Sequence, residues 1–146
     1  MNNPNFPLQV RHHFDFLFSK YRFSVESESY TGFPLAEWII KLISTELCVQ
    51  ISIDKSQVFI DIGTPRKENY WFDLMYLMMY ISQDINKWQY LRLGGEINEG
   101  YYDKQLVSLS EILKENYEQI KTTATNISVN KNEKKKFEKF VSKHSK

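Results

Sequence analysis

The chain has 146 residues, the size of a single domain, and its 42% hydrophobic and 15% aromatic content excludes a disordered protein. A single cysteine, Cys48, excludes a disulfide within the chain, and the longest apolar stretch, residues 71–81, is too short to cross a bilayer. The formal net charge of +1 divides unevenly, because the residues from Lys131 onward carry +5 (seven lysines and two glutamates) and the preceding part therefore carries −4.

The first predicted element is an amphipathic helix over residues 8–21. Pro7 suits its start, because the missing N–H of proline would be unpaired in the first turn anyway. The apolar residues recur three or four positions apart and so share one helical face: Val10, Phe14, Leu17 and Tyr21.

Four stretches then predict an antiparallel β-meander, with strands at residues 22–30, 35–44, 47–54 and 57–63. The third and fourth alternate apolar and polar residues around a short polar turn, as a β-hairpin does. The second has the composition of either a buried helix or a strand, and its β-branched residues favour the strand. Because sequential strands usually lie side by side, the strand order should follow the chain.

Two further helices are predicted, over residues 70–88 and 103–121, and should cover one face of the sheet. Residues 122–132 are polar without a clear period and predict a linker. Residues 133–144 form either a solvated basic tail or a short basic helix that is marginal alone.

The predicted architecture is therefore α+β, with an N-terminal helix, a four-stranded antiparallel β-meander and helices packed on one face. Residues 1–121 should form a single α+β domain. Residues 122–146 should form a polar linker and a basic C-terminal tail that is dispensable for folding.

A candidate partner-binding surface follows from the polar positions of the strands. Alternation predicts that the acidic side chains of the strands lie together on the uncovered side of the sheet: Glu26, Glu28, Asp54 and Asp61. Phe59 on the fourth strand, with Tyr30 nearby, would be the apolar anchor of this surface. Such a surface would attract a basic protein partner. The simpler interpretation is a solvated strand face.

No catalytic, cofactor-binding or metal-binding residue is predicted. Adjacent residues on a helix point about 100° apart, so His12 and His13 do not converge on a metal. Gly94-Gly95 lacks the lysine and hydroxyl of a phosphate-binding loop. Cys48 has no neighbour in sequence that would activate its thiol.

Residues 47–63, LCVQISIDKSQVFIDIG, followed by Trp71-Phe72-Asp73-Leu74 opening a helix, resemble uncharacterised bacterial families of small stand-alone proteins. These families are built as a helix, a β-meander and further helices. Some proteins of this shape resemble immunity proteins, which neutralise a toxin. The resemblance implies inhibition of a partner and carries no catalytic residues.

The sequence thus predicts a non-enzymatic protein-binding module, with immunity-type inhibition of a toxin as its sharpest form. The alternative is a small-ligand carrier or an enzyme with a pocket between sheet and helices. A cytoplasmic protein is expected, because residues 1–7 lack the basic start of a signal peptide. Membrane binding is not expected, and the acidic body argues against nucleic acid as a partner. No feature of the sequence sets an oligomeric state.

Overall fold

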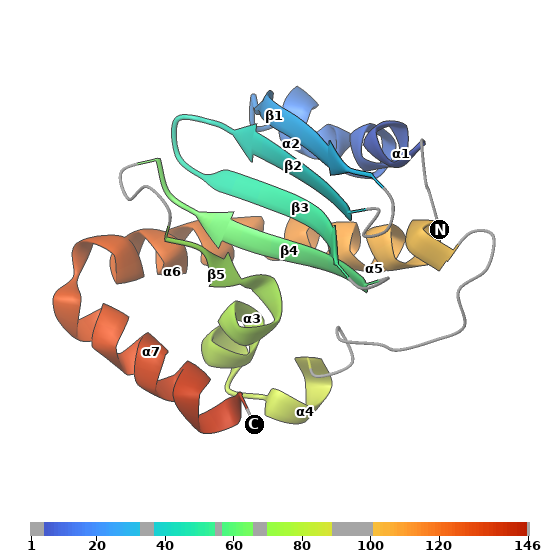
Figure 1. Ribbon diagram of the computed structural model, residues 1–146. Helices are drawn as coiled ribbons and strands as arrows, with labels where there is room; N and C mark the ends of the chain where they lie inside the picture. The colour runs from blue at the N-terminus through green and yellow to red at the C-terminus, as the bar shows by residue number, and fades with distance from the viewer. Residues whose placement is uncertain (1–4, 33–36, 55–56, 66–69, 89–100, 146) are drawn as a thin grey trace.

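The computed structural model describes residues 5–32, 37–54, 57–65, 70–88 and 101–145. Its centre is a five-stranded antiparallel sheet in the order β1-β2-β3-β4-β5 (Figure 1). The strands are β1 (Ser24–Thr31), β2 (Glu37–Ile43), β3 (Cys48–Asp54), β4 (Gln57–Gly63) and β5 (Phe72–Asp73). The helices are α1 (Phe6–His13), α2 (Asp15–Ser19), α3 (Leu74–Ser82), α4 (Ile85–Trp88), α5 (Tyr101–Glu115), α6 (Tyr117–Val129) and α7 (Lys131–His144).

The predicted α+β fold is confirmed, including the N-terminal helix and the four strands of the meander in chain order. Residues 37–43 form a strand, as their β-branched composition favoured, and not a buried helix. The fifth strand, β5, lies inside the helix predicted from residue 70. Helix α3 begins only after Asp73, whose Oδ1 accepts a hydrogen bond from the backbone N–H of Met75 at 2.8 Å and so caps the helix.

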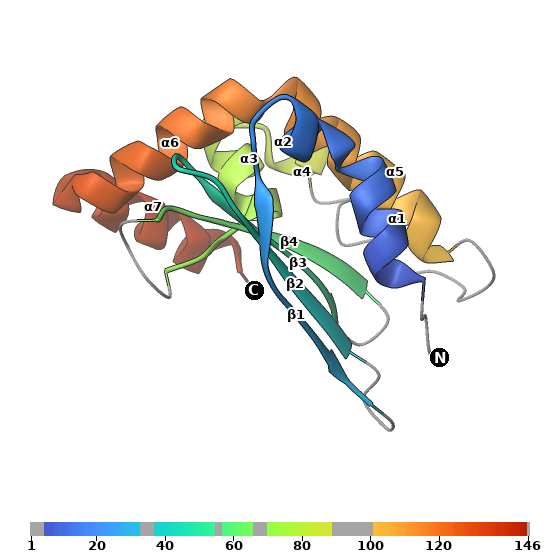
Figure 2. The same ribbon diagram turned by 90° about the horizontal axis from the view of Figure 1, so that it is seen from above.

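The core lies between one face of the sheet and the helices. Figure 2, seen from above, shows α1, α2, α5 and α6 on one side of the sheet, with no described helix over the other side of β1, β2 and β3. Ile40, Ile51 and Ile60 stand opposite one another on three neighbouring strands and are all buried. Their burial fixes the register, because a slip of one residue would turn this apolar row outward.

The N-terminal helix is interrupted near its middle. Phe14 leaves helical geometry, with φ −105° and ψ 21°, and separates α1 from α2. Its ring and that of Phe6 are fully buried. The helix predicted over residues 8–21 is therefore two short helices that keep the predicted apolar residues Val10 and Leu17 in the core.

The C-terminal part differs most from the prediction. Residues 117–129 form α6 where a linker was predicted from residue 122, and Ala124, Ile127 and Ser128 are buried. Helix α7 follows and is N-capped by Asn130, whose side chain accepts from two backbone N–H groups. Phe137 of α7 is 4% exposed and packs edge-on against the ring of Phe72. The segment from residue 122 onward is thus helical and packs on the body.

Candidate functional site

The side of the sheet that faces away from the helices is called the open face here. Residues directly opposite each other in an antiparallel pair share a face, so the register assigns each side chain to a side. The open face includes Ser27, Ser29, Ile39, Lys41, Gln50, Ser52, Asp54, Phe59 and Asp61. The open-face side chains in the middle of β2, β3 and β4 are half-buried: Ile39, Lys41, Gln50, Ser52, Phe59 and Asp61. The side chains that alternate with them are buried in the core: Ile40, Leu42, Val49, Ile51, Ile53, Val58, Ile60 and Ile62.

Three of the predicted partner-binding residues lie on the open face. Asp61 stands opposite Gln50 on β3 and opposite Asp73 on β5. Phe59 stands opposite Ser52. Asp54 ends β3 at the hairpin end of the sheet and is exposed.

A β-bulge in β1 separates the other two acidic residues. Val25 stands opposite Leu42 and Ser27 opposite Lys41, so Glu26 is an extra residue without a partner in the register. After the bulge, Glu28 stands opposite Ile40 and so lies on the side that faces the helices. The expectation that all the acidic strand residues share one side is therefore wrong for Glu28.

Glu26 lies near Cys48. Burial, with a smaller contribution from the Glu26 carboxylate, raises the pKa of the Cys48 thiol above its ordinary value. Cys48 is buried, and a buried thiol that stays protonated is a poor nucleophile.

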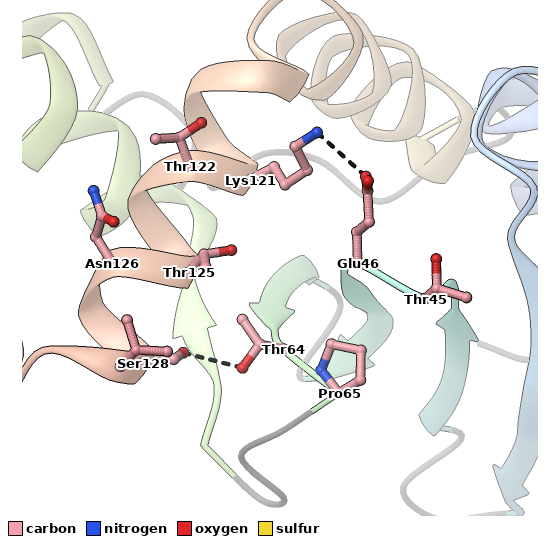
Figure 3. Close-up of a pocket in the computed structure, with 10 residues that line it drawn as sticks. Thr45, Glu46, Thr64, Pro65, Lys121, Thr122, Thr125, Asn126 and Ser128 are labelled. Carbon is pink, nitrogen blue, oxygen red and sulfur yellow. Dashed lines mark hydrogen bonds and ion pairs between the residues drawn. The ribbon is translucent and has the colours of Figure 1, made fainter.

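A polar groove of about 390 Å³ lies where α6 passes the ends of β2 and β4. Figure 3 shows Lys121, Thr125 and Ser128 of α6 pointing toward the turn after β2 and the residues that follow β4. Hydroxyl groups dominate the lining, together with one amide and one ion pair: Thr45, Glu46, Thr64, Pro65, Lys121, Thr122, Thr125, Asn126, Ser128 and Val129. At its base Thr64 donates a hydrogen bond to Ser128 at 3.0 Å, and both side chains are buried.

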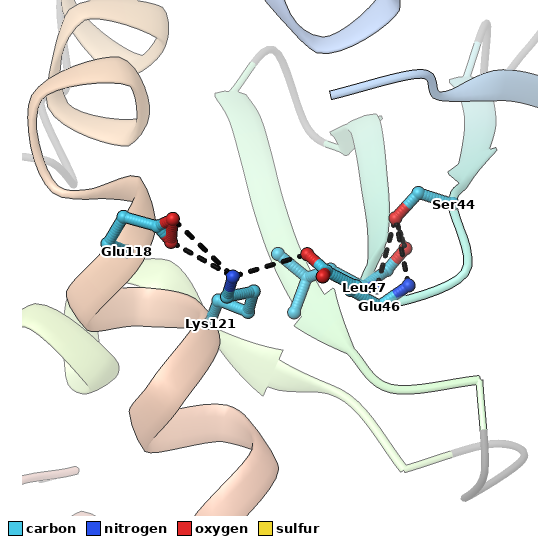
Figure 4. A network of polar contacts seen from close by, with 5 residues as sticks. All are labelled: Ser44, Glu46, Leu47, Glu118 and Lys121. Atoms are coloured by element: carbon cyan, nitrogen blue, oxygen red, sulfur yellow. Dashed lines mark hydrogen bonds and ion pairs between the residues drawn. The ribbon is translucent and has the colours of Figure 1, made fainter. Parts of the chain in front are cut away.

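Lys121 joins α6 to the turn between β2 and β3 (Figure 4). Its Nζ lies 3.0 Å from Oε2 of Glu118 and 3.2 Å from Oε2 of Glu46. Hydrogen bonds to Glu118 and Glu46 raise the pKa of the Lys121 amine. The amine is therefore held in its charged form, which suits an ion pair and does not suit a nucleophile.

The turn that carries Glu46 is itself fixed by a side chain. Ser44 Oγ accepts hydrogen bonds from the backbone N–H of Glu46 at 3.2 Å and of Leu47 at 3.1 Å, and it donates to the Leu47 carbonyl at 3.1 Å. The groove thus has one wall set by a helix and one set by a tight turn.

Tyr117 begins α6 behind this network and is 2% exposed. Its ring stacks on Tyr21 with centroids 3.6 Å apart. The buried hydroxyl makes no hydrogen bond of good geometry within the described part of the chain. Burial, and next the Glu46 carboxylate, raise the pKa of this phenol far above its ordinary value, although the nearby Ser44 offsets part of the rise. Tyr117 is therefore a neutral core residue and not a proton acceptor.

His12 and His13 have different surroundings. His13 contacts Asp103 on α5, with Nε2 and Oδ1 2.7 Å apart, and this contact ties α1 to α5. His12 is exposed. Among the residues that the structure describes, no three His, Cys, Asp or Glu side chains gather into a possible metal site.

Sequence reasoning missed the polar groove because its residues are distant in the chain. Lys121 and Glu46 lie far apart in the chain, as do Thr64 and Ser128, so no local sequence pattern links either pair.

Gly94 and Gly95 lie outside the described residues. No helix in the described ranges is long and apolar enough to span a membrane.

In comparisons with known proteins, no family model, no curated protein and no solved structure matches this chain.

Proposed function

We propose that this protein acts in the cytoplasm by binding a basic protein partner through the open face, without catalysing a reaction. The observation that carries the proposal is a sheet covered by helices on one side only, within the described ranges, with Asp54, Phe59 and Asp61 on the other side. Non-obligate protein interfaces combine polar groups with aromatic residues, and the open face offers both.

Charge gives the proposed surface its preference. The chain before Lys131 carries −4, and the open face has two aspartates among its β3 and β4 positions. Lys41 is the single cation among the open-face residues named above, and it stands opposite Gln50. A surface of this sign speeds the approach of a basic partner and makes the association rate depend on salt.

The sharpest form of the proposal is immunity-type inhibition. A toxin that acts on nucleic acid must itself carry a basic cleft to hold phosphates. An acidic, largely pre-formed sheet face would cover such a cleft without a chemical step. This form rests on the family resemblance of residues 47–74 in addition to the charge.

The test begins with an affinity capture of partners by the full chain. The captured protein is then measured against Asp54→Lys and Asp61→Lys variants, with Glu111→Lys as the matched control on the exposed side of α5. We expect both open-face variants to slow association and to flatten its salt dependence, and the control to do neither. An association rate that ignores both the reversals and added salt would exclude the open face as the binding surface.

A second candidate is a carrier or enzyme for a small polar ligand. The groove between α6 and the ends of β2 and β4 favours it, because hydroxyl groups and the Glu46–Lys121 pair face the same space (Figure 3). Mass spectrometry of the purified chain distinguishes the two. A small molecule that co-purifies with the chain and is lost in Lys121→Met would favour the carrier, and the absence of any retained ligand would favour the protein-binding module.

A further inference from the structure

The two edges of the sheet are treated differently. At the β4 edge, β5 pairs with Asp61 and Ile62, and Gln105 of α5 covers the next part. Oε1 of Gln105 accepts hydrogen bonds from the backbone N–H of Val58 at 3.0 Å and from the side chain of Gln57 at 2.9 Å. The chain therefore closes this edge with a strand and a helix side chain, as proteins do to prevent unwanted pairing.

The opposite edge, β1, has no such cover among the described elements. The sheet ends at β1, which pairs with β2 on its inner side from Ser24 to Thr31. All eight residues of β1 are exposed. Figure 2 shows β1 as the outermost strand, running out beyond the ends of the helices. A strand edge presents backbone N–H and C=O groups at the spacing that another strand needs.

We propose that the outer edge of β1 accepts an extended basic segment of a protein partner as a sixth strand; this inference rests on the proposed function and names how the partner is held. The bulge at Glu26 leaves a regular stretch from Ser27 to Thr31 for pairing. Adding a strand to a sheet edge is a known mode of peptide recognition, in which the backbone gives affinity and alternate side chains give specificity.

The side chains of β1 define the segment that fits. Glu28 and Tyr30 lie on one face, and Ser27, Ser29 and Thr31 on the other. A strand added beside β1 would place a Lys or Arg next to Glu28 and an apolar residue next to Tyr30.

The Tyr30 position has an aromatic support. The Tyr30 ring lies 4.7 Å from the ring of Trp38 on β2, and Trp38 in turn lies 6.5 Å from the buried ring of Phe6. The rings of Tyr30, Trp38 and Phe6 thus run from the edge strand to the core, so an apolar residue of the partner can pack on a Tyr30 ring that is supported from behind. The small hydroxyl side chains on the other face suit threonine or serine neighbours.

A second copy of the chain fits the edge less well. Pairing β1 with β1 would bring two strands together that each carry Glu26 and Glu28, and like charges across a strand pair are destabilising. The bulge also twists the first residues of β1 away from a flat edge-to-edge dimer. Charge thus selects a basic occupant.

The test uses the full chain and the synthetic peptide acetyl-KTVTKTVTK-amide. This pattern reads the same in both strand directions, with Lys and Val on one face and Thr on the other. The comparison peptides are acetyl-ETVTETVTE-amide and two forms of the lysine peptide that are N-methylated at alternate amides. Binding is followed by titration and by amide hydrogen exchange of β1.

We expect the lysine peptide to slow exchange in residues 27–31 and to bind about fivefold more tightly than the glutamate peptide. Glu28→Lys should reverse this preference, and the matched control Glu111→Lys should not. One of the two methylated forms should lose binding, because one set of peptide amides must face β1.

Three results would overturn the inference: equal binding of the parent peptide and both methylated forms, equal binding of the lysine and glutamate peptides, or unchanged exchange in β1. Protection of β1 that grows with protein concentration alone would assign the edge to a second copy instead. Failure of the proposed function is distinguishable, because Asp61→Lys then leaves association with the captured partner unchanged while the peptide still binds β1.

Discussion

Replacing Tyr117 by phenylalanine should stabilise the protein at neutral pH. The substitution removes only the hydroxyl, which is buried without a well-formed hydrogen bond, and leaves the ring stacked 3.6 Å from Tyr21. A buried polar group without a partner costs roughly 1–3 kcal/mol. Because Ser44 lies near and offsets part of this cost, the gain should be at the low end, about 1 kcal/mol. For a chain of this length that raises the melting temperature by roughly 2–4 °C.

The same substitution should change the stability at alkaline pH. The folded pKa of Tyr117 lies above the unfolded value near 10, so above pH 10 the unfolded state loses its proton first. The stability from the protonated phenol is fully present below pH 10 and falls as the pH rises, by up to about 1.4 kcal/mol per pH unit. Tyr117→Phe removes the part of this decline that comes from Tyr117, whereas burial also raises the pKa values of Tyr70 and Tyr80, which keep the rest of the decline.

The assay is urea unfolding of the wild type and Tyr117→Phe between pH 7 and 11, with Tyr76→Phe as the control for loss of a tyrosine hydroxyl. The difference between wild type and Tyr117→Phe should widen steadily above pH 10, in favour of the variant. A variant that is less stable than the wild type at pH 7 would show that the hydroxyl is hydrogen-bonded in the folded protein. A difference that stays constant to pH 11 would show that burial does not hold the phenol neutral.

Three further predictions concern the core, the last helix and the groove. Ile51→Ala should lower the free energy of unfolding by about 2–5 kcal/mol, because Ile51 is fully buried between sheet and helices; an unchanged urea midpoint would contradict the assignment of the inward face. Phe137→Ala should lower the free energy of unfolding by about 3 kcal/mol, because Phe137 is buried against Phe72, and truncation after Asn130 should lower it at least as much. Thermal melts measure both changes. Melting temperatures equal to that of the full chain would show that α7 is dispensable, as the sequence alone suggests. Lys121→Met should cost less than about 1 kcal/mol and should remove the salt dependence of this contact, since both its carboxylate partners are exposed; a larger loss would mean that the ion pair holds α6 in place.

The strands of the meander were predictable because their signal is local. In β3 and β4 the alternation of apolar and polar residues predicts both a strand and the face of it that is buried, and Val49, Ile51 and Ile53 are buried as this alternation predicts. Helix α3 was also visible, but not its start, because the capping role of Asp73 depends on the pairing of β5 with β4. Helix α6 was not predicted beyond residue 121, because its buried side includes the small residues Ala124 and Ser128, which give a weak apolar period.

The candidate surface was predictable only in part. Asp54, Phe59 and Asp61 lie on the open face because β3 and β4 keep an unbroken period. In β1 a single extra residue at Glu26 moves Glu28 to the other side, and a bulge of this kind leaves no mark in a serine- and glutamate-rich strand. The groove joins residues such as Glu46 and Lys121, whose proximity arises only when α6 crosses the end of the sheet.

The order of the elements along the chain has a consequence for biosynthesis. The meander from β1 to β4 is complete at Gly63, whereas α5 and α6, which cover it together with α1, end only at Val129. At about 5–20 residues per second, the ribosome needs several seconds to make that cover. A meander that pairs during this interval lacks α5 and α6 over the row of Ile40, Ile51 and Ile60, and its exposed β1 edge can pair with other strands. The nascent chain therefore passes through an aggregation-sensitive stage, in which binding by a chaperone would act on the half-finished sheet.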